Sequence, residues 1–186
     1  GKMYKVTELF KNTPINQEII GTYLPCFVAE KIDETWWQYL PLKEGLHFDD
    51  YLTLLSKISL DIENAKENQR RIEKIYQQLL QYNFENSYGN YQQKLQQWGK
   101  TNKILSMGNT FLSPEELSYT NIEGFSLKHQ VYTGKIEEKE KLVDLLKLFG
   151  VKIYTEENIE ALCDIKQEDY KISTRLLSIV SILALL

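Results

Sequence analysis

Cysteine and histidine are scarce in this sequence, with two of each among 186 residues. Cys26 and Cys163 lie far apart, form no CxxC pair, and are accompanied by no N-x-[ST] glycosylation site. We expect two reduced, mostly buried thiols in a reducing compartment, which predicts a cytoplasmic protein; one disulfide between them is the alternative. A metal site needs three or four converging ligands, so His47 and His129 alone predict none.

Long apolar runs are also lacking until the last residues. The run Leu176–Leu186 is apolar throughout but is far shorter than the roughly 20 residues that span a bilayer. It predicts a buried helix that packs within the chain or between two copies; a membrane helix cut short is the alternative. The opening Gly1-Lys2-Met3 carries no signal-peptide pattern. We therefore expect a piece excised from a larger protein that does not enter a membrane.

An excess of positive charge is absent too. The formal net charge is −4 and the pI is about 5.4, whereas nucleic-acid-binding domains are normally basic. The densest basic cluster lies within residues 66–74, but glutamates interspersed there nearly cancel its charge. We interpret it as a solvated helix face and expect no nucleic-acid partner.

Two apolar stripes with helical spacing predict a pair of helices over 47–62 and 64–82. The short connection between them predicts an antiparallel arrangement. The expected core residues are Phe48, Tyr51, Leu52, Leu55, Ile58 and Ile62 on the first helix, and Ile72, Ile75, Tyr76, Leu79 and Leu80 on the second.

The region that follows predicts a short helix near 92–98 and then a β hairpin. The runs 103–106 and 110–112 flank Gly108-Asn109, and glycine accepts the positive φ of a primed turn. Ser113 followed by Pro114 then predicts the start of a helical turn.

Two further helices are expected at 137–149, ended by Gly150, and at 155–164, with an extended run between them. The sequence therefore predicts a mainly α fold with a small β hairpin or three-stranded patch. Residues 1–40 would form an N-terminal arm with a first helix over 30–40. Residues 41–186 would form a helical domain carrying the hairpin, and the two would make one compact unit.

No motif predicts a catalytic or cofactor-binding residue. Gly99-Lys100-Thr101 matches the end of a phosphate-binding loop, but Lys94 occupies the position of the required first glycine. Paired glutamates recur at the expected helix starts, where the helix dipole explains them without catalysis.

Aromatic residues gather at Trp36, Trp37 and Tyr39 on the helix expected over 30–40. Their first interpretation is an anchor that holds this helix to the core. The alternative is a surface that binds a partner protein, because interfaces also favour aromatic residues. These three residues are the candidate partner surface.

Three stretches occur in an order that resembles sacsin-like proteins: Leu40–Leu55, Lys103–Tyr119 and Leu145–Tyr154. Sacsin-like proteins are large intracellular chains with an ATPase domain of the histidine-kinase/Hsp90 type. The resemblance covers residues 40 to about 160 and implies an accessory region downstream of that domain. The family's nucleotide-binding residues would lie outside this chain, so the resemblance assigns no functional residue here.

The leading hypothesis is therefore a non-catalytic scaffold or protein-interaction domain of a larger multidomain protein. Its partners would be other domains of the same chain, other proteins, or a second copy bound through the C-terminal helix. A regulatory segment that couples a neighbouring ATPase to client proteins is the second hypothesis. An enzyme of unrecognised type is the third.

Overall fold

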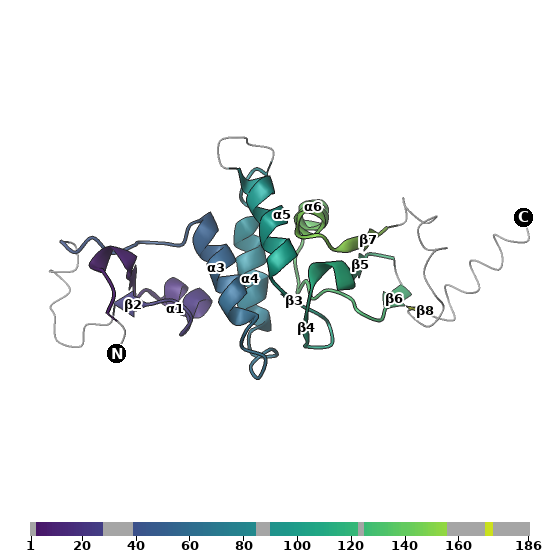
Figure 1. Cartoon of the computed structure of the whole chain (residues 1–186), viewed down its shortest axis with the longest axis horizontal. Coiled ribbons are helices and arrows are strands. Elements are labelled where there is room, and N and C mark those ends of the chain that lie inside the picture. Colours follow the sequence, from purple (N-terminus) through teal and green to yellow (C-terminus); the bar gives the residue numbers. More distant parts are fainter. Residues whose placement is uncertain (1–2, 28–38, 85–89, 123–124, 156–169, 173–186) are drawn as a thin grey trace, which may run out of the picture.

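The chain has a mixed α/β fold. The structure, a computed structural model, describes residues 3–27, 39–84, 90–122, 125–155 and 170–172 (Figure 1). Among the described residues 42% are helical and 16% lie in strands, so the prediction of a mainly α fold is wrong. Apart from the hairpin over 103–112 and the extended run between the last two expected helices, the strands escaped the sequence analysis because they are two or three residues long. Such short segments cannot show the alternation of apolar and polar residues that marks a strand.

Five α-helices and two short 3-10 turns are described. The helices are α1 (Pro14–Ile20), α3 (Phe48–Ile58), α4 (Gln69–Leu79), α5 (Tyr91–Thr101) and α6 (Lys139–Phe149), and the turns are η1 (Val6–Glu8) and η3 (Pro114–Glu116). None of the described helices is long and apolar enough to cross a membrane. The helices expected over 30–40 and 155–164 fall almost wholly outside the described residues, and the apolar run 176–186 falls wholly outside them.

The strands pair two by two. Parallel pairs are β1 (Phe10–Lys11) with β2 (Cys26–Phe27) and β5 (Ser118–Thr120) with β7 (Lys152–Tyr154); antiparallel pairs are β3 (Ile104–Leu105) with β4 (Phe111–Leu112) and β6 (Phe125–Leu127) with β8 (Tyr170–Ile172). The parallel pairs join segments that are distant in the sequence.

Helices α3, α4 and α5 form an antiparallel layer at the centre of the molecule (Figure 1). The predicted stripes are confirmed, since every expected core residue of the two helices is buried except Ile62. Helix α3 begins where the His47 N–H donates to Asp50 Oδ2 at 3.0 Å. Helix α4 begins later than expected, because residues 63–68 form turns. In this α3–α4 turn (residues 59–68), Leu60 is 81% exposed and Ile62 is 67% exposed.

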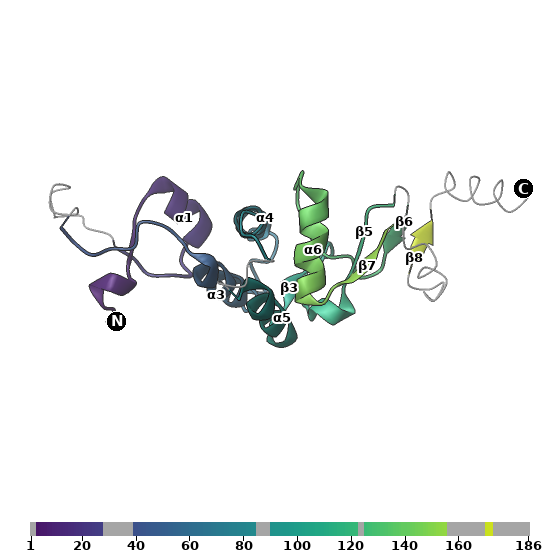
Figure 2. The same cartoon turned by 90° about the horizontal axis from the view of Figure 1, so that it is seen from above.

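Helix α6 runs across this layer, since it is seen end-on in Figure 1 and lengthwise in Figure 2. Its apolar face is buried, and Gly150 ends it with a φ of 99°, as the sequence predicts. Helix α5 approaches the end of α6 very closely at Gly99. A Cβ atom placed on Gly99 would lie 2.1 Å from the Phe149 carbonyl oxygen, so only glycine fits this contact.

Trp98, the neighbour of Gly99, holds α5 to both α3 and α6. Its Nε1–H donates to the Leu52 carbonyl oxygen at 3.0 Å and to Ser56 Oγ at 2.7 Å. Its ring centroid lies 5.0 Å from that of Phe149. Trp98 is therefore a packing residue at the junction of three helices.

The predicted hairpin is present as β3 and β4, with Leu105 opposite Phe111. Residues 129–132 run between this hairpin and the β5–β7 pair. Tyr132 N–H donates to the Leu105 carbonyl at 2.8 Å, and Val131 N–H donates to the Ser118 carbonyl at 2.9 Å. The hairpin and the β5–β7 pair, which lie beside α6 (Figure 2), are thus joined by main-chain hydrogen bonds through residues 129–132.

The turn of the hairpin differs from the prediction. Asn109 has a φ of 59°, whereas Gly108 is not in the left-handed region. Asn109 N–H donates to the Ser106 carbonyl at 3.0 Å, and Ser106 N–H donates to the Thr110 carbonyl at 2.8 Å. The loop is therefore a turn followed by a left-handed residue, and the expected two-residue primed turn at Gly108-Asn109 is wrong.

We expect alanine at position 108 to be tolerated and alanine at position 109 to lower the free energy of unfolding by about 1–2 kcal/mol. A Cβ on Gly108 would meet only Ser106 Oγ, at 3.6 Å. Alanine at 109 would place a residue without a polar side chain in the left-handed region. It would also remove the Oδ1 atom that accepts a hydrogen bond from Gln69 Nε2 at 2.6 Å. Urea denaturation of both variants checks this, and an equal loss at both positions would contradict it.

The described residues before α3 (3–27 and 39–47), which we call the N-terminal part, pack beside α3 and α4 (Figure 1). Strand β1 lies between β2 and the main chain of Lys43, whose carbonyl accepts from Lys11 N–H at 2.9 Å. On α1, Glu18 forms ion pairs with Arg70, at 2.7 Å, and with Lys74 of α4. The N-terminal part is therefore joined to the central helices by polar contacts as well as by its buried isoleucines.

A second polar contact connects the N-terminal part to the α3–α4 turn. Tyr23 Oη donates to Asp61 Oδ2 at 2.5 Å and accepts from Asn68 Nδ2 at 2.6 Å. The hydrogen bond from Tyr23 lowers the pKa of the Asp61 carboxyl group, with further help from Asn64. The carboxylate of Asp61 thus accepts hydrogen bonds from both Tyr23 and Asn64.

Candidate functional site

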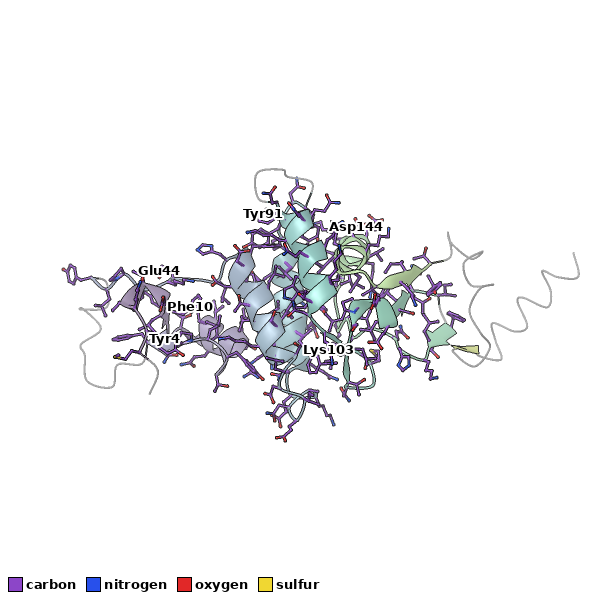
Figure 3. The ribbon with its side chains drawn as sticks, in the orientation of Figure 1. Tyr4, Phe10, Glu44, Tyr91, Lys103 and Asp144 are labelled. Atoms are coloured by element: carbon purple, nitrogen blue, oxygen red, sulfur yellow. The ribbon has the colours of Figure 1, made fainter. Side chains whose placement is uncertain are left out.

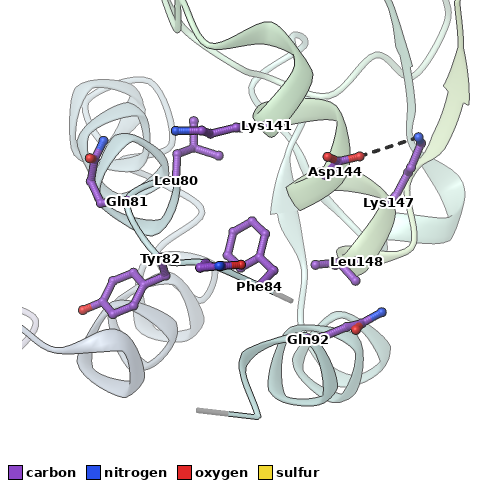
Figure 4. Close-up of a pocket in the computed structure, with 10 residues that line it drawn as sticks. Leu80, Gln81, Tyr82, Phe84, Gln92, Lys141, Asp144, Lys147 and Leu148 are labelled. Atoms are coloured by element: carbon purple, nitrogen blue, oxygen red, sulfur yellow. Dashed lines mark ion pairs between the residues drawn. The ribbon is translucent and has the colours of Figure 1, made fainter. Parts of the chain in front are cut away.

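A pocket of about 510 Å³ opens where the end of α4, the start of α5 and one side of α6 meet (Figure 4). Figure 3 shows Tyr91 and Asp144 together at this end of the helical layer, with Lys103 at the opposite end. We call it the α4–α6 pocket. The described residues that line it are Leu80, Gln81, Tyr82, Asn83, Phe84, Gln92, Lys141, Asp144, Lys147 and Leu148.

The floor of the α4–α6 pocket is apolar. Leu80 is buried, and Phe84 and Leu148 are half-buried and pack against the hydrophobic core. In Figure 4 the Phe84 ring projects into the space between Leu80 and Leu148. An apolar side chain of a ligand would therefore find an aromatic and two aliphatic contacts there.

The rim of the pocket is polar. Gln81, Asn83 and Gln92 contribute three amide groups, each with a donor and an acceptor. Helix α6 contributes Lys141, Asp144 and Lys147, which share one face because they are three residues apart.

Both rim lysines have local partners. Lys141 Nζ lies 2.5 Å from a carboxylate oxygen of Glu138, and Lys147 Nζ lies 3.7 Å from Asp144 Oδ1 (Figure 4). Each lysine side chain is 59% exposed, so both ammonium groups remain open to solvent and to a ligand.

An aromatic cluster supports one edge of the pocket. The ring of Tyr82 lies 5.1 Å from that of Phe48 and 5.2 Å from that of Tyr91, measured between centroids. Burial raises the pKa of Tyr82, and the neighbouring Tyr91 adds to this effect. Tyr82 is thus neutral at physiological pH and presents an apolar ring with a hydroxyl group that can donate.

The structure does not bring the candidate partner surface to this pocket. Trp36 and Trp37 lie outside the described residues. Tyr39 is 73% exposed in the N-terminal part and does not line the pocket. The proposed role of these three residues as a partner surface stays a prediction.

The pocket residues were missed because their signal is spread over three segments. Residues 81–97 read as a Tyr-, Asn- and Gln-rich stretch, and Phe84 gives no periodic pattern there. Lys141 and Lys147 lie on a helix for which the sequence analysis recognised only the apolar face and the final glycine. The one available signal was the dense run of aromatic and amide residues just after a firm helix.

The other sequence motifs have structural roles. Gly99-Lys100-Thr101 ends α5, so its glycine serves the contact with α6. His47 is the residue that precedes α3, and Asp49 and Asp50 lie in its first turn, where a carboxylate suits the helix dipole. In the described part of the chain, no group of three or more His, Cys, Asp or Glu side chains is placed to hold a metal ion. Cys26 is a free thiol whose pKa is raised by burial, and Cys163 lies outside the described residues.

Comparison with known proteins assigns this chain to no family. No protein-family model, curated protein or solved structure matches the chain. The resemblance to sacsin-like proteins therefore stays a prediction from the sequence.

Proposed function

We propose that the chain is a non-catalytic interaction domain of a larger multidomain protein, and that the α4–α6 pocket docks a segment of a partner protein. The observation that carries this proposal is the combination of an apolar floor, formed by Leu80, Phe84 and Leu148, with a rim of amides and lysines. Protein interfaces have the same anatomy, in which an apolar centre is surrounded by polar groups.

The amide groups of the rim favour an extended peptide as the ligand. Gln81 and Gln92 can each donate to a peptide carbonyl and accept from a peptide N–H, because an amide group has two donor hydrogens and one acceptor oxygen. The volume of about 510 Å³ is within the range of ligand pockets, roughly 300–1,000 Å³, and holds one or two large side chains. A peptide with an apolar anchor residue would thus satisfy both the floor and the rim.

We expect a random peptide library displayed on phage to yield binders whose affinity depends on Leu148. The variant Leu148→Arg would place a charged side chain on the apolar floor and should weaken those peptides at least 10-fold, because burying an unpaired charge is costly. Isothermal titration calorimetry of synthetic peptides on both proteins measures the loss.

The matched control is Thr53→Arg, which adds the same charge on the exposed surface of α3, away from the pocket. Peptides that bind all three proteins equally well, or a library without any binder, would contradict the proposal. Circular dichroism of Leu148→Arg establishes that the variant is folded before its binding is compared.

A further inference from the structure

We draw no further inference here: the strongest candidate, a second pocket of about 310 Å³ between the last turn of α4 and residues 135–138, shares Leu80 and Gln81 with the α4–α6 pocket and so belongs to the site already described, and nothing in the structure shows what covers it.

Discussion

Replacing Gly99 with alanine is expected to lower the free energy of unfolding by about 3 kcal/mol, at the upper end of the usual cost of overpacking. In an ordinary helix, replacing glycine with alanine stabilises the protein by roughly 0.5–1 kcal/mol. The change expected at Gly99 therefore has the opposite sign to the one that helix propensity alone predicts. The reason is the contact with α6, where a Cβ would lie 2.1 Å from a main-chain oxygen of Phe149. The oxygen belongs to the main chain of α6 and the Cβ would be fixed to the main chain of α5, so neither atom can rotate away and one helix must move.

Urea denaturation followed by circular dichroism measures this loss. The matched control is Gly45→Ala, because Gly45 has no positive φ and a Cβ there would meet nothing within 4 Å. We expect the control to change the free energy of unfolding by less than about 0.5 kcal/mol. If Gly99→Ala were as stable as the control, the close approach of α5 and α6 would be wrong.

Replacing Trp98 with alanine is expected to cost about 3–5 kcal/mol, as for other large aromatic residues in a core. The side chain is 8% exposed and packs against Phe149 from α6. Its removal would leave a cavity at the junction of α3, α5 and α6. It would also remove the donor to Leu52 and Ser56.

The variant Trp98→Phe separates the two contributions. Phenylalanine keeps most of the packing but has no N–H, so we expect it to lose about 1–3 kcal/mol. A phenylalanine variant as unstable as the alanine variant would assign the whole effect to the hydrogen bonds. Thermal and urea denaturation of both variants give the comparison, and circular dichroism is the appropriate probe because the substitution removes a fluorophore.

The sequence predicts the parts of this fold that depend on local patterns. Helices α3, α4 and α6 were predictable because each carries an apolar stripe longer than two turns. The end of α6 was predictable because glycine is favoured in the left-handed region at Gly150. The β3–β4 hairpin was predictable because its strands are neighbours in the sequence.

The rest depends on contacts between distant segments, which a single sequence does not reveal. Strand β5 pairs with β7 across α6, and each contributes only three residues. Position 99 requires glycine because of its contact with Phe149, which lies far along the chain. From the sequence alone, Gly99 is only part of a chance motif. The α4–α6 pocket was invisible for the same reason, since three segments meet to form its walls.

The order of the helices along the chain has a consequence during synthesis. Helices α3, α4 and α5 are consecutive, so their layer can form once Thr101 has left the ribosome. Trp98 and Gly99, however, face Phe149, which is synthesised later. At about 5–20 residues per second, this face of α5 is without its partner for several seconds. The nascent chain therefore passes through a stage at which an apolar helix face is accessible to chaperones. That stage ends when α6 packs against α5, and the absence of a side chain at Gly99 matters only then.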